Sequence, residues 1–106
     1  MLRAQVSWIE YYLPEKILGN SELASLYPEW PADQIEAKTG IQYRHIAAED
    51  ETSSDMAVKA ARKLFASGKC TPDEIEFVFL CTESPDYFLP PSSCLIQQQL
   101  GISTSA

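Results

Sequence analysis

Residues 38–52 read KTGIQYRHIAAEDET, and this stretch carries four structural signals in a row. Gly40 is typical of a helix end, because glycine readily adopts the left-handed backbone found there. Residues 41–47 alternate weakly and predict an extended segment or hairpin arm, and the acidic residues 49–51 predict a turn. Thr52 or Ser53 can then cap a new helix. The stretch therefore links two helices through one extended segment.

The segments after this stretch predict a helix, a strand and a second helix. The first helix ends at Gly68 and shows apolar residues at spacings of three and four: Met56, Ala57, Ala60, Ala61, Leu64 and Phe65. Thr71 begins a short capped turn, and the mostly apolar run 75–82 predicts a central strand covered on both faces. Residues 92–100 predict a helix that ends at Gly101.

The segments before the stretch predict one strand and two short helices. Residues 4–12 read as a strand that Pro14 closes. Asn20 is a candidate N-cap for a helix of about two turns before Pro28, and residues 31–38 predict a second short helix that begins with proline. A long helix between two strands indicates an α/β fold with a parallel or mixed sheet and covering helices.

Length and composition indicate one globular domain spanning residues 1–106. The hydrophobic content of 45% is enough to build a core in a chain of 106 residues. The net charge of −7 opposes long-range attraction to nucleic acid or anionic lipid, so neither is an expected partner. An acidic protein partner is compatible with this charge, because docking depends on a local basic patch.

The cysteine pattern favours a reducing compartment. Cys70, Cys81 and Cys94 match neither a redox pair nor a zinc motif, and three is an odd number for a disulfide framework. No basic and apolar leader is visible, and no apolar run approaches the roughly 20 residues that span a bilayer. We therefore expect a cytoplasmic protein without a metal site.

Four blocks, in order along the chain, resemble the beta-ketoacyl-ACP synthase III family of the thiolase superfamily. They are residues 12–16 with Asn20, residues 38–47, residues 54–57 at a helix start, and residues 90–101. The block TGI-x-x-R-x-I-A within residues 39–47 is the most specific of them. The resemblance implies a partial thiolase-like α/β fold that forms the N-terminal portion of such an enzyme.

The resemblance also implies a reaction. Family members load an acyl group from acyl-CoA onto a cysteine and condense it with malonyl-ACP, with loss of carbon dioxide. Their Cys-His-Asn set is expected beyond Ala106, so no catalytic residue is assigned and the chain alone is expected to be inactive. The implied parent is a homodimer that needs no cofactor other than coenzyme A as part of its substrate.

Two residues are candidates for coenzyme A binding by this resemblance. Lys38 stands where the family usually has an arginine that helps hold coenzyme A, and lysine keeps the charge but loses the planar fork. Gln34 stands where the family has a tryptophan that stacks on adenine. Trp30, four residues earlier, is the candidate substitute, and the alternative is that it packs against the short helices.

Leu89 matches a family position, often phenylalanine, that reaches across the dimer interface to the partner's acyl pocket. The alternative is that Leu89 anchors its own loop beside Pro90 and Pro91. His45 is the single histidine, and its family position is a loop without a catalytic role. Cys81 and Cys94 are interpreted as packing residues, and the acidic run 49–51 as a solvated turn.

Three alternatives are open, two for the function and one for the chain itself. One is a free-standing, non-catalytic interaction module, such as a decayed paralogue that pairs with a complete condensing enzyme. Another is a superfamily enzyme that condenses coenzyme A thioesters alone. The third concerns the chain itself, which is either a truncation or a natural short protein. Apolar residues 77–80 also predict self-association.

Overall fold

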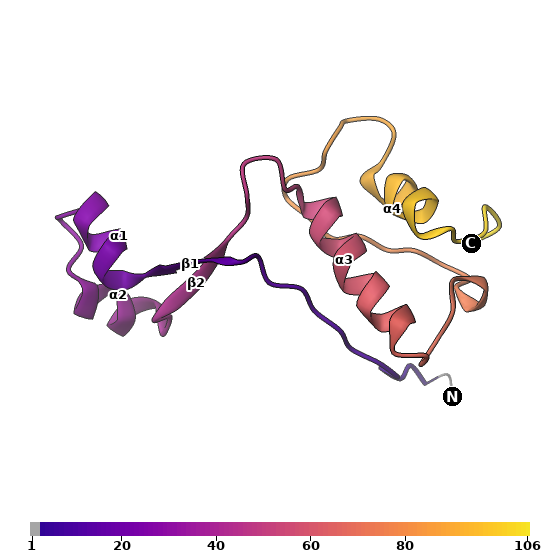
Figure 1. Cartoon of the computed structure of the whole chain (residues 1–106), viewed down its shortest axis with the longest axis horizontal. Helices are drawn as coiled ribbons and strands as arrows, with labels where there is room; N and C mark the ends of the chain where they lie inside the picture. The colour runs from indigo at the N-terminus through magenta and orange to yellow at the C-terminus, as the bar shows by residue number, and fades with distance from the viewer. Residues whose placement is uncertain (1–2) are drawn as a thin grey trace. The chain divides into compact units, whose positions relative to one another are not determined.

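The computed structural model describes residues 3–106, which form two compact units. One unit comprises residues 13–50, and the other comprises residues 3–12 together with residues 51–106. Figure 1 shows the first as a hairpin with two short helices, and the second as a pair of longer helices with their connecting segments.

A two-stranded antiparallel hairpin organises the unit of residues 13–50. Strand β1 (Lys16–Gly19) pairs with β2 (Tyr43–Ile46), with Lys16 opposite Ile46 and Gly19 opposite Tyr43. Helices α1 (Asn20–Leu26) and α2 (Ala32–Thr39) lie between these strands in sequence and pack against each other. The expected extended segment in residues 41–47 is thus confirmed, whereas its partner β1 was not predicted.

Local signals account for α2 but not for the start of α1. Gly40 closes α2 with a φ of 68°, as the sequence predicts, whereas Pro31 is its N-cap and the helix begins one residue later than predicted. The prediction of Asn20 as an N-cap is wrong, because Gly19 holds that position and Asn20 is the first residue of α1. The buried Asn20 amide donates to the Ile41 carbonyl at 2.8 Å and accepts from Arg44 at 2.7 Å, so it joins α1 to the segment around β2 instead.

Helices α3 (Ser53–Ala66) and α4 (Ser92–Leu100) form the core of the other unit, where they pack against each other (Figure 1). The buried apolar residues here are Val58 on α3, Ile96 on α4 and Ile102 just after α4. Both helices and their glycine-marked ends agree with the sequence prediction. The short turn after Thr71 is a 3₁₀ helix (Pro72–Glu74), closed by a capping box between Thr71 and Glu74.

Two predicted strands do not form within residues 3–106. Residues 4–12 and 75–82 have no strand assignment, and the one sheet in this part of the chain is the β1–β2 hairpin. The expected crossover between those two segments is therefore absent from the described structure. Phe77 and Phe79 are 76% and 81% exposed, so residues 75–82 are not covered on both faces. A strand needs a hydrogen-bonded neighbour, and these segments find none here.

Candidate functional site

The two residues expected at a coenzyme A site lie together in the unit of residues 13–50. Trp30 lies two residues before the start of α2, and Lys38 belongs to its last turn. The Lys38 Nζ lies 4.4 Å from the centroid of the Trp30 ring, within the range of a cation–π contact. The pair thus places a positive charge beside a flat aromatic surface.

An apolar pocket adjoins this pair. It has a volume of about 290 Å³ and is lined by Leu23, Tyr27, Trp30 and Ile35. Ile35 is buried, whereas Trp30 keeps 41% of its surface exposed. Trp30 therefore contacts the short helices and still offers part of its ring to solvent, so the two interpretations of this residue are compatible. Gln34, at the position of the family's tryptophan, is exposed on α2 and does not line the pocket.

A larger hollow in the same unit has the opposite electrostatic character. Its volume is about 560 Å³, and its lining includes Glu22, Asp33 and Glu36. Glu36 accepts a hydrogen bond from the Gln42 amide at 2.7 Å. Three carboxylates repel a phosphorylated ligand. Of the two hollows, the one beside Trp30 and Lys38 is the better match for a nucleotide.

Leu89 lies in the loop 83–91 of the other unit, which leads into α4. Its side chain is 80% exposed and that of Phe88 is fully exposed, and the Leu89–Pro90 peptide bond is cis. A side chain that anchors its own loop would be buried, so the exposure of Leu89 favours contact with another molecule. Tyr87 and Phe88 of the same loop line a pocket of about 310 Å³, to which Leu89 does not contribute.

Hydroxyl groups tie this loop to the start of α3. The Ser53 hydroxyl donates to the Ser84 carbonyl at 2.9 Å and accepts from the Thr82 hydroxyl at 3.3 Å. The Asp86 backbone N–H donates to the Ser92 hydroxyl, at the start of α4, at 3.1 Å. The loop is therefore held at both ends by the first residues of two helices.

Asp86 is a residue that the sequence interpretation missed. Both of its carboxylate oxygens are buried, and no donor within residues 3–106 makes a hydrogen bond of ordinary geometry to them. The nearby hydroxyl of Ser54, and then those of Thr52 and Ser92, hold the pKa of this carboxyl below its ordinary value against the opposing effect of burial. The signal available in the sequence was an aspartate in the segment between two helices that each begin with serine.

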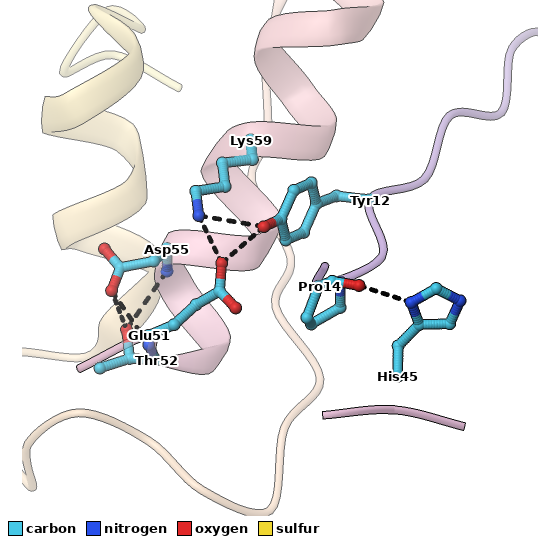
Figure 2. A network of polar contacts seen from close by, with 7 residues as sticks. All are labelled: Tyr12, Pro14, His45, Glu51, Thr52, Asp55 and Lys59. Carbon is cyan, nitrogen blue, oxygen red and sulfur yellow. Dashed lines mark hydrogen bonds and ion pairs between the residues drawn. The ribbon is translucent and has the colours of Figure 1, made fainter. Parts of the chain in front are cut away.

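A polar network joins the N-terminal segment to α3 (Figure 2). The Tyr12 hydroxyl donates to Glu51 Oε1 at 2.7 Å, and the Lys59 ammonium pairs with the same oxygen. Glu51, and secondly Tyr12, raise the pKa of Lys59 well above its ordinary range. The interpretation of residues 49–51 as merely solvated is wrong for Glu51, whose side chain is only 8% exposed.

The histidine and cysteines show no nucleophilic arrangement within residues 3–106. The His45 Nδ1 lies 2.5 Å from the Pro14 carbonyl oxygen, a contact that fixes the ring to the backbone (Figure 2). All three cysteines are free. The packing interpretation of Cys81 and Cys94 is wrong here, because both are exposed. Cys81 lies in the segment that lacks a covering neighbour, which explains its exposure.

No group of three His, Cys, Asp or Glu side chains in residues 3–106 is placed to hold a metal ion. None of the helices in that range combines the length and apolar character needed to cross a membrane.

Similarity to curated proteins covers nearly the whole chain. The beta-ketoacyl-(acyl-carrier-protein) synthase III of Campylobacter jejuni is 41% identical over an alignment of 106 positions that covers 96% of this chain and 32% of that protein. The enzyme of the same name from Cereibacter sphaeroides is 38% identical over 102 residues, 96% of this chain and 31% of that protein. The chain thus spans about a third of the length of these relatives. No protein-family model matches it.

Solved structures agree with these relatives. A crystal structure of a 3-oxoacyl-(acyl-carrier-protein) synthase III is 55% identical to this chain, with a TM-score of 0.83. The match covers 92% of this chain and 29% of the chain in that structure. The synthase III structure from Thermus thermophilus is 29% identical, with a TM-score of 0.83 over 93% of this chain and 30% of its own. These likenesses confirm the partial thiolase-like α/β fold. The chain accordingly resembles, over nearly its whole length, about a third of the beta-ketoacyl-ACP synthase III enzymes.

Proposed function

We propose that this chain is the N-terminal portion of a condensing enzyme that joins an acyl group from acyl-CoA to malonyl-ACP. The observation that carries the proposal is the 38–41% identity to proteins named beta-ketoacyl-(acyl-carrier-protein) synthase III over 96% of the chain. On this proposal residues 1–106 act as one N-terminal domain of a cytoplasmic, homodimeric acyltransferase in fatty-acid or related biosynthesis. Acyl-CoA and acyl carrier protein are then its partners.

Within this enzyme, Trp30 and Lys38 contact coenzyme A. The support is chemical, because an aromatic face, a neighbouring cation and an apolar pocket suit a ligand with a flat base and phosphate groups. Lysine acts on phosphate as a point charge, without the bidentate geometry of arginine. The Lys38 ammonium rests on the Trp30 ring, so a base that stacks on that face must displace it.

Leu89 contacts the acyl pocket of the second subunit on the same proposal. Its support is an apolar side chain that is 80% exposed next to a fully exposed Phe88. A leucine fills less volume than the phenylalanine often found in the family. We therefore expect Leu89→Phe to narrow the range of acyl chains that the enzyme accepts.

A malonyl-ACP condensation assay tests the proposal. Residues 1–106 are assayed with acyl-CoA beside the product of the uninterrupted reading frame that encodes them. Activity in the longer product and none in residues 1–106 is the expected result. Activity in neither, with pull-down of a complete condensing enzyme by the chain, would instead favour the non-catalytic interaction module. Activity with acyl-CoA but without acyl carrier protein would favour an enzyme that uses coenzyme A thioesters alone.

A further inference from the structure

The carboxylate of Asp86 lies near the first turns of two helices. Ser54 and Thr52 belong to the start of α3 and Ser92 to the start of α4, and all three hydroxyls influence this carboxylate. Ser54 and Ser92 are themselves buried, at 3% and 4% exposure. Helix N-termini carry partial positive charge, so an anion at this place is favoured by both helices. The site selects for a negative charge rather than for a neutral polar group.

Asp86 also stands directly before the most exposed part of its loop. Tyr87, Phe88 and Leu89 follow it, and their side chains are 62%, 103% and 80% exposed. Pro90 and Pro91 then lead into α4. Prolines limit the backbone freedom of this short connection. A fixed point at Asp86 therefore restricts where the three exposed side chains can lie.

We propose that Asp86 is a positioning residue, whose buried carboxylate between the first turns of α3 and α4 holds the exposed tip Tyr87–Leu89 in place. Loss of this charge frees the tip while the packed part of α3 and α4 stays folded. The consequence for substrate selection rests on the proposed function of Leu89, whereas the effect on the loop does not.

Few charged groups compete with Asp86 at this place. Helix α4 has no charged residue, and Glu83 in the same loop is exposed. On α3, the Asp55 carboxylate accepts from the Thr52 backbone N–H at 3.0 Å and from the Thr52 hydroxyl at 2.9 Å, so it is already engaged in the capping box. If amide exchange in the loop changes with pH in the acid range, comparison of variants of Asp86 and Glu83 shows which carboxylate is responsible.

Amide hydrogen exchange of residues 1–106 with residue resolution gives the first test. Asp86→Asn keeps the side-chain shape and removes the charge, and Glu83→Gln removes the same charge from an exposed position of the same loop. Tip exchange is followed at the two hydrogen-bonded amides that flank residues 87–89. The amide of residue 86 donates to the Ser92 hydroxyl, and the Cys94 amide donates to the Pro91 carbonyl. We expect Asp86→Asn to speed exchange of both by about tenfold, with the Val58 amide on α3 unchanged. Glu83→Gln should leave all of these amides unchanged. Equal acceleration at Val58 and at the tip would overturn the proposal, because it would indicate general loss of stability.

The pH dependence gives a readout that packing alone would not change. The pKa of Asp86 is lowered in the folded chain, so its contribution is present above the ordinary aspartate pKa and is lost as pH falls through the folded value. Tip exchange, corrected for the intrinsic rate, should rise on acidification in the wild type and in Glu83→Gln, and stay flat in Asp86→Asn. The same rise in Asp86→Asn would overturn the proposal. If that variant does not fold, Ser54→Ala supplies the test. We expect it to speed tip exchange by a smaller factor, and no change in tip exchange would overturn the proposal.

The condensation assay separates this inference from the proposed function. In the longer product of the reading frame, Asp86→Asn should change the ratio of kcat/KM between short and long acyl-CoA, and Glu83→Gln should not. If Leu89→Ala leaves that ratio unchanged while the exchange results hold, the proposed role of Leu89 fails and the positioning by Asp86 stands. If exchange at the tip does not respond to Asp86→Asn, the positioning role is refuted whatever the enzyme's activity.

Discussion

The Lys38 ammonium lies over the Trp30 ring, and this contact can be followed spectroscopically because the chain has only two tryptophans. In a Trp8→Phe background Trp30 alone reports, and we expect coenzyme A to change its fluorescence as Lys38 leaves the ring. Lys38→Ala should weaken coenzyme A binding roughly twofold to fivefold, since an exposed cation at such a site contributes about 0.5–1 kcal/mol. Lys16→Ala removes the same charge from β1 and serves as the control. Equal weakening by both variants would mean that net charge, not the site, attracts the ligand.

Glu10 supplies a pH-dependent contact at the scale of one residue. Its carboxylate accepts from the Tyr11 N–H at 3.0 Å and pairs with Lys63 at 3.2 Å. Both contacts lower the pKa of Glu10, and the hydrogen bond from Tyr11 has the larger effect. A lowered pKa stabilises the fold above the unfolded value, and this contribution is lost as pH falls through the folded value. Glu10→Gln should lower the urea midpoint at pH 7, and should lower it progressively less as pH falls through the folded pKa. Glu15→Gln, at an exposed position, should change the urea midpoint neither at pH 7 nor in acid. If Glu10→Gln lowers the midpoint equally in acid, the charge of Glu10 is not the cause.

The capping box of α3 makes a prediction at the scale of an element. Thr52 accepts from the Asp55 N–H at 3.2 Å, and Asp55 accepts from the Thr52 N–H at 3.0 Å. Thr52→Ala should lower the free energy of unfolding by about 1 kcal/mol, measured by urea denaturation. Thr52→Ser keeps the hydroxyl and should stay within a few tenths of a kcal/mol of the wild type. A comparable loss in both variants would assign the effect to the threonine methyl group instead.

The elements that sequence predicted well are those whose causes are local. Thr52 caps α3, and Gly40 and Gly101 close α2 and α4 with positive φ, all within a few residues of the signal. The strands failed for the opposite reason. Strand β1 forms because Lys16–Gly19 meets Tyr43–Ile46, about 25 residues away, whereas residues 75–82 carry a strand-like pattern without a neighbour in this part of the chain.

The candidate sites divide in the same way. Lys38, Trp30 and Leu89 were named from a family resemblance, and the structure adds their exposure and the Lys38–Trp30 contact. Asp86 was missed because its importance depends on hydroxyls from three separate positions, Thr52, Ser54 and Ser92, that come together only in the fold. Such convergence leaves no periodic trace in a single sequence.

For the chain as a whole, residues 77–80 predict self-association. Phe77 and Phe79 are largely exposed, and within residues 3–106 no neighbouring strand pairs with this segment. Unpaired extended segments with apolar side chains pair readily with other chains. Light scattering and sedimentation over a roughly hundredfold concentration range should show oligomers that dissociate on dilution. Phe79→Glu should shift the equilibrium to monomer, whereas Ile41→Glu, an exposed apolar position near the hairpin, should not. A monomer at every concentration would refute this prediction, and equal loss of oligomers in both variants would point to a general effect of added charge rather than to this segment.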